Sequence, residues 1–113
     1  MSDLPDAFND SLSSDRIINS EFHQEIWLLH GYASNERDLH ALSPYLDKKY
    51  TIRSLRATFP LPSGGFAWYG LEFDFNGLKE TNLPQAKESL SLINKALDWH
   101  KFKYPNSPKP ILL

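Results

Sequence analysis

The stretch that decides the fold is Trp27-Leu28-Leu29-His30-Gly31-Tyr32-Ala33-Ser34-Asn35-Glu36-Arg37-Asp38-Leu39. Its apolar run ends at His30-Gly31, and a polar turn then opens an amphipathic segment. A short continuous apolar run fits a strand buried on both faces, as in a parallel sheet. The stretch therefore predicts a buried strand, a tight turn and the start of a helix. A turn of this kind points backbone N–H groups into a shared cleft, where they can hold an oxyanion.

The helix that follows the turn carries its own start signals. Ser34 or Asn35 can cap it, and Glu36 and Asp38 lie in its first turn, where acids suit the positive end of the helix dipole. Pro44 interrupts the apolar spacing and is expected to kink or shorten the helix. Its predicted apolar face consists of Leu39, Leu42 and Leu46.

The rest of the chain continues the alternation of strand and helix. Residues 50–56 favour a strand and lead into a loop, residues 57–75, that is rich in proline, glycine and aromatic residues. Asn82-Leu83-Pro84 is a helix start and Pro105 a helix stop, which predicts a helix over 83–104. Residues 111–113 predict a second buried strand. The stripe Leu90, Ile93 and Leu97 is predicted to face the core.

The order strand, helix, strand, long loop, helix, strand predicts an α/β fold with a parallel sheet and helices on its faces. In such sheets, ligands bind beyond the carboxyl ends of the strands. Tyr32 and the loop over residues 57–75 are expected to meet there.

Composition excludes several classes of protein. The chain has 113 residues, a formal net charge of -2 and no cysteine. The absence of a basic stripe argues against a nucleic-acid partner, and the absence of cysteine excludes disulfides and thiolate zinc sites. The first residues are acidic, unlike a signal peptide, and no apolar run reaches membrane-spanning length. We therefore expect a soluble, cytoplasmic protein.

Two regions are expected. Residues 1–20 are mostly polar and predict a mobile arm, although Ile17-Ile18 could instead pack on a sheet edge. Residues 21–113 are expected to form the α/β portion.

Three ordered segments resemble one known family. Leu28-Leu29-His30-Gly31-Tyr32 with its polar continuation, Ser54-Leu55-Arg56-Ala57 before a proline-rich loop, and Gly65-Phe66-Ala67-Trp68-Tyr69 resemble the phospholipase/carboxylesterase branch of the α/β-hydrolases. The resemblance covers residues 25–113. It implies the α/β-hydrolase fold and hydrolysis of a small-molecule ester or thioester through an acyl-enzyme, with serine as nucleophile, histidine as base and aspartate as its orienting partner.

The resemblance also implies site residues. The backbone N–H of Tyr32 is one donor of the oxyanion hole, and His30 and Gly31 shape the turn that carries it. Trp68 and Tyr69 lie on the acyl or alcohol side of the substrate pocket. Such an enzyme needs no metal ion and no organic cofactor.

The sequence departs from the family in the nucleophile. The family carries it in a Gly-x-Ser-x-Gly elbow after the strand that here begins at Ile111, and this sequence contains no Gly-x-Ser-x-Gly. Thr58 also replaces the usual proline after Arg-Ala. We therefore expect the amino-terminal portion of an α/β-hydrolase, truncated before the elbow, without a triad and inactive alone.

A non-catalytic interaction module or a truncated gene product is the alternative. An uncovered apolar sheet edge would favour self-association.

Other chemically capable residues favour structural roles. His30 is expected to support its turn by hydrogen bonding rather than act as a base. His23, His40 and His100 lack metal-ligand spacing and are interpreted as surface residues. Glu72 and Asp74 are interpreted as the polar face of an extended segment, and Ser63 as part of a flexible loop.

Overall fold

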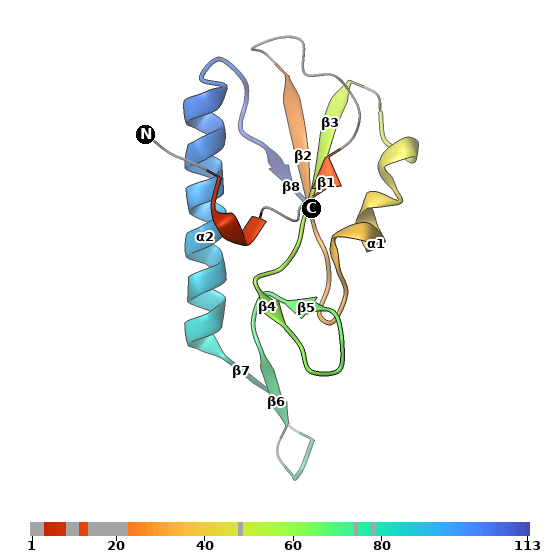
Figure 1. The fold of residues 1–113 in the computed structure, drawn as a ribbon, viewed down its shortest axis with the longest axis vertical. Coiled ribbons are helices and arrows are strands. Elements are labelled where there is room, and N and C mark those ends of the chain that lie inside the picture. Colours follow the sequence, from red (N-terminus) through yellow and green to blue (C-terminus); the bar gives the residue numbers. More distant parts are fainter. Residues whose placement is uncertain (1–3, 9–11, 14–22, 48, 74, 78) are drawn as a thin grey trace.

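The computed structural model describes residues 4–8, 12–13, 23–47, 49–73, 75–77 and 79–113. Its centre is a four-stranded sheet in the order β1-β3-β2-β8 (Figure 1). Strand β2 (Gln24–Leu29) pairs in parallel with β3 (Tyr50–Leu55) on one side and with β8 (Ile111–Leu112) on the other. The short β1 (Leu12–Ser13) pairs antiparallel with β3. The predicted α/β architecture with a small parallel sheet is confirmed.

Helices α1 (Glu36–His40) and α2 (Leu83–Lys103) lie on opposite sides of this sheet in Figure 1. Successive side chains of a strand point to opposite faces of the sheet, so each face presents apolar side chains that a helix can cover. Ile26, Leu28 and Ile52 form one core cluster, against which Leu39 and Leu46 pack. The opposite face holds a second cluster of buried side chains from β2, β3, α2 and the N-terminal segment: Trp27, Leu55, Ala96 and Phe8.

Both helix starts follow from their capping residues. The Asn35 side chain accepts a hydrogen bond from the backbone N–H of Arg37, and the Asn82 side chain accepts one from that of Gln85. Helix α1 ends at His40, and Pro44 lies in a separate 3-10 turn, Ser43–Tyr45. The expectation that Pro44 shortens the first helix agrees with this break.

The predicted core stripe of α2 is partly wrong. Ile93 and Leu97 pack against the core, but Leu90 is 58% exposed. The fully buried positions of α2 are Ser89, Ala96 and His100. Leu90 lies about 100° around the helix from Ser89, so its side chain points away from the sheet.

The prediction of a buried strand over residues 111–113 is also partly wrong. The strand forms and pairs with β2, but Ile111, Leu112 and Leu113 are 43%, 42% and 61% exposed. Strand β8 lies at one edge of the sheet, and an edge strand is covered only where another element packs on it. Association through this edge stays a prediction.

The predicted arm and the predicted loop contain ordered structure. Within residues 1–20, the segment Asp6–Phe8 forms a 3-10 turn, and Phe8 is buried in the core instead of belonging to a mobile arm. Ile17 and Ile18 lie outside the described residues. The predicted aromatic loop, residues 57–75, contains one antiparallel pair, β4 (Phe59–Pro60) with β5 (Phe66–Ala67). It also contains β6 (Leu71–Phe73), which pairs antiparallel with β7 (Lys79–Thr81) beyond the loop. In the described part of the chain, no helix is long and apolar enough to cross a bilayer.

A bidentate ion pair fixes α1 to the end of β3. Arg56 donates from Nε and Nη2 to the two carboxylate oxygens of Glu36, at 2.8 and 2.6 Å, and Glu36 is buried. These hydrogen bonds lower the pKa of Glu36 from its ordinary value, against the opposing effect of burial.

We expect Glu36→Gln to lower the free energy of unfolding at pH 7 by about 2 kcal/mol. Because the folded-state pKa is depressed, the stabilisation is present above the unfolded pKa and is lost as pH falls through the folded value. The difference between wild type and variant should therefore shrink below about pH 4. Urea denaturation at a series of pH values measures it. A difference that stays constant down to pH 2 would contradict the ion pair.

Candidate oxyanion turn and a buried histidine–glutamate cluster

The turn after β2 is held in a sharp conformation by the aromatic loop. Ala33 has a φ of 66°, in the left-handed region. Its backbone N–H donates to the carbonyl of Phe66 at 2.9 Å, and the N–H of Phe66 donates to the carbonyl of Ser34 at 2.8 Å. These two bonds lock the turn against β5. The backbone at residues 31–33 is therefore positioned by the fold and not only by its own sequence.

His30 is the internal support of this turn, as its sequence position suggested. Its Nε2 accepts a hydrogen bond from the backbone N–H of Ala57 at 2.9 Å, so its Nδ1 carries the proton and donates to the carbonyl of Gly31 at 2.8 Å. The side chain is 2% exposed. Both ring nitrogens are occupied by backbone groups, which leaves neither for proton transfer.

Trp68 closes the other side of the turn. Its indole N–H donates to the carbonyl of His30 at 3.0 Å, and its ring lies 5.8 Å from the imidazole, between centroids. The Ser89 hydroxyl on α2 donates to the Trp68 carbonyl at 2.5 Å. Trp68 thereby connects the aromatic loop to the turn after β2 and to helix α2.

The structure brings all five predicted site residues together. A cavity of about 180 Å³ is lined by His30, Gly31, Tyr32, Trp68 and Tyr69. It lies beyond the carboxyl end of β2, where ligands bind in parallel sheets. Among the described residues, the backbone N–H groups of Gly31 and Tyr32 have no hydrogen-bond partner. The turn can therefore offer two donors to an anionic oxygen.

The other sequence candidates do not join this cavity. The described residues that line it include no serine and no carboxylate. Ser63 is exposed in the loop between β4 and β5, and Glu72 is exposed on β6. Asp74 lies outside the described residues. The site as described can polarise a carbonyl but supplies no nucleophile.

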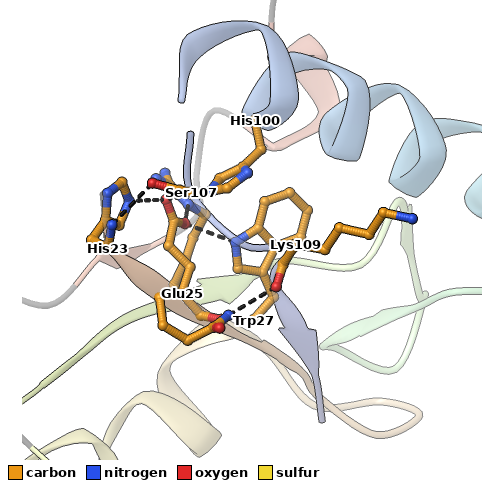
Figure 2. Close-up of polar contacts among 8 residues, drawn as sticks. His23, Glu25, Trp27, His100, Ser107 and Lys109 are labelled. Atoms are coloured by element: carbon orange, nitrogen blue, oxygen red, sulfur yellow. Dashed lines mark hydrogen bonds and ion pairs between the residues drawn. The ribbon is translucent and has the colours of Figure 1, made fainter. Parts of the chain in front are cut away.

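A second cluster of polar side chains lies at the opposite end of β2 and was not predicted. His23 and Glu25 point from the start of β2 toward His100 of α2, as Figure 2 shows. His23 Nε2 lies 2.8 Å and His100 Nε2 lies 3.2 Å from Glu25 Oε2. These three residues are grouped closely enough to hold a metal ion. The interpretation of His100 as a surface residue is wrong, since it is 2% exposed, and the side chain of His23 is only 9% exposed.

Glu25 is the centre of this cluster and is fully buried. Its Oε1 accepts hydrogen bonds from Trp27 Nε1 at 2.8 Å and Arg53 Nε at 3.0 Å. Burial alone would raise its pKa, but the nearby His100 ring, the charge of Arg53 and hydrogen bonds from Arg53 and His23 hold that pKa well below its usual range. The carboxylate is therefore ionised in the folded protein.

The neighbouring Tyr104 packs its ring 4.4 Å from that of His23, between centroids. Burial, and secondarily the negative charge of Glu25, raise the pKa of the Tyr104 hydroxyl. The phenol thus stays neutral beside the carboxylate.

One sequence signal could have found part of the cluster. His23 and Glu25 are two residues apart and share one face of the strand. His100 lies 75 positions beyond Glu25 in the sequence. It joins the cluster only through the packing of α2 over that face, so no pattern in the sequence signals it.

No family model matches this sequence, and comparisons with curated proteins and with solved structures find no match.

Proposed function

We propose that this chain forms the oxyanion-binding turn and part of the acyl pocket of a serine carboxylesterase of the phospholipase/carboxylesterase type, within an α/β-hydrolase fold. One observation carries the proposal. The residues that the family resemblance implies, from two segments more than thirty positions apart, line one cavity, and the Tyr32 N–H has no partner in the described chain.

The geometry of the turn suits stabilisation of a tetrahedral intermediate. When a nucleophile attacks an ester carbonyl, the oxygen gains negative charge, and N–H donors fixed beforehand stabilise that charge. One such donor contributes about 3 kcal/mol to the transition state in a typical hydrolase. The hydrogen bonds of Ala33 and His30 hold the Gly31 and Tyr32 N–H groups in place before substrate arrives. This supports a preorganised oxyanion hole.

The two aromatic side chains suit the substrate's apolar part. Trp68 is half-buried and fixed by its indole hydrogen bond, whereas Tyr69 is 39% exposed. The cavity of about 180 Å³ is smaller than the roughly 300 Å³ at which drug-sized ligand pockets begin. We therefore propose a short acyl or alcohol group as its occupant.

The chain itself supplies no elbow serine, since the sequence contains no Gly-x-Ser-x-Gly. Losing the nucleophile removes nearly all activity and leaves only binding and oxyanion contributions. We therefore propose that the chain of 113 residues is catalytically silent by itself.

The test is hydrolysis of p-nitrophenyl butyrate and labelling by a fluorophosphonate probe. We expect the 113-residue chain to remain at the uncatalysed background and to take up no label. If the source reading frame continues past codon 113 into Gly-x-Ser-x-Gly, the longer protein should hydrolyse the ester and be labelled at that serine. Labelling of a serine within residues 1–113, or a longer protein with the motif that neither reacts nor hydrolyses, would contradict the proposal.

A further inference from the structure

We propose that His23, Glu25 and His100 form a binding site for one divalent transition-metal ion, with Zn²⁺ as the best fit. The site is separate from the oxyanion turn and lies at the amino-terminal end of β2. The three ligand atoms are Nε2 of each histidine and Oε2 of the glutamate.

The spacing of these atoms is close to that of a tetrahedral site. Bonds of about 2.0 Å from a zinc ion place neighbouring ligand atoms about 3.3 Å apart. The observed separations are 2.8 Å from His23 Nε2 and 3.2 Å from His100 Nε2 to Glu25 Oε2, and one potential ligand atom of each residue lies within 4.8 Å of the other two. The two histidine–glutamate separations thus lie within about 0.5 Å of the tetrahedral spacing.

The His100 ring has one buried nitrogen that could bind a ligand. His100 is 2% exposed, and its Nε2 makes no hydrogen bond within the described chain. It lies 3.2 Å from Glu25 Oε2 without hydrogen-bond geometry. Buried polar atoms almost always have a partner. A metal ion between His100 and Glu25 would supply one.

The surroundings of Glu25 fix it as a ligand. Trp27 and Arg53 both donate to Oε1, which leaves Oε2 directed at the histidines. Hydrogen bonds of this kind orient a metal-binding carboxylate and keep it ionised. The positive charge of Arg53 opposes a second cation, so we expect weaker binding than at a four-ligand structural zinc site.

A cavity borders the cluster at His100. It has a volume of about 550 Å³ and lies between the C-terminal half of α2 and the segment that precedes β8, with His100 and Ser107 in its wall. The Ser107 hydroxyl accepts the backbone N–H of His23 at 2.9 Å, which joins this segment to the site. Three protein ligands with one open position is the arrangement of zinc sites that bind water or a substrate. Imidazole and carboxylate together favour Zn²⁺ over Mg²⁺ or Ca²⁺.

Metal binding by the full chain, freed of metal with a chelator, tests the proposal. We expect one Zn²⁺ per chain by equilibrium dialysis, a rise in melting temperature with Zn²⁺, and a visible d–d absorption band with Co²⁺. His23→Gln and His100→Gln should each weaken binding at least about tenfold and abolish the Co²⁺ band. His23 lies just before β2 and is less buried than His100, so its variant keeps the test informative if His100→Gln fails to fold.

His40→Gln is the matched control, because it removes a histidine outside the cluster by the same substitution. It should leave binding unchanged. Absence of saturable Zn²⁺ binding in the wild type would overturn the proposal. Binding that survives His23→Gln, or that is lost in His40→Gln, would overturn it equally.

Discussion

Glu25→Leu should lower the free energy of unfolding of the metal-free protein by about 3–5 kcal/mol, the usual cost of removing one partner of a buried ion pair. Glu25 is fully buried, and the Arg53 side chain is only 12% exposed. The leucine would leave Arg53, the Trp27 indole N–H and the His23 ring without their acceptor. Urea denaturation in the presence of a chelator measures the loss.

Two further variants sharpen this result. Glu88→Leu makes the same substitution at an exposed position of α2 and should change stability by less than about 0.5 kcal/mol. In an Arg53→Leu background, Glu25→Leu should cost less than in wild type, because the charge it would leave uncompensated is gone. Suppose instead that Glu25→Leu in the otherwise wild-type chain costs less than about 1 kcal/mol. Water would then be solvating Arg53 in place of the Glu25 carboxylate, and the cluster would be open to solvent.

Gly65→Ala should cost about 2–4 kcal/mol, because the added methyl group has no room. Gly65 has a φ of +74°, and a Cβ built there would lie 2.1 Å from the carbonyl oxygen of Ala33 and 2.5 Å from its carbonyl carbon. These are backbone atoms of the turn after β2. Relief of the clash requires the turn or the loop to move.

Gly77→Ala separates this clash from backbone strain. Gly77 has nearly the same φ, +76°, and nothing lies within 4 Å of its added Cβ. It should therefore show only the cost of a left-handed alanine, about 1 kcal/mol. Thermal or urea denaturation compares the two, and amide spectra should show residues 31–34 displaced only in Gly65→Ala. Equal losses for the two variants would contradict the close approach of loop and turn.

Elements with local start and stop signals could be predicted from sequence. The Asn35 and Asn82 caps, the break at Pro44 and the end of α2 before Pro105 all depend on neighbouring residues. The parallel pairing of β2 with β3 and β8 followed from the alternation of strands and helices. The five residues around the turn were named through the family resemblance, which rests on short contiguous segments of sequence.

Features set by tertiary packing could not be predicted. The exposure of Leu90 depends on the rotation of α2 about its axis, which apolar spacing alone left ambiguous. The burial of Phe8 depends on how an N-terminal segment folds back onto Trp27. Likewise, Glu25 meets His100 only because α2 crosses one particular face of β2. Local propensity carries no information about these three contacts, because they depend on how segments distant in sequence pack together.

We propose that the turn after β2 binds an oxyanion through the backbone N–H groups of Gly31 and Tyr32. The most direct measurement is a titration of the ¹⁵N-labelled chain with butylphosphonate, a tetrahedral anion, while the amide signals of Gly31 and Tyr32 are followed. We predict saturable downfield shifts of these amide protons. Butanol should not produce them, since it fills the pocket without an anionic oxygen. Tyr32→Pro, which lacks the N–H, should weaken binding, and Tyr32→Ala, which keeps it, should not. Unmoved Gly31 and Tyr32 signals, or equal shifts with butanol, would contradict the account.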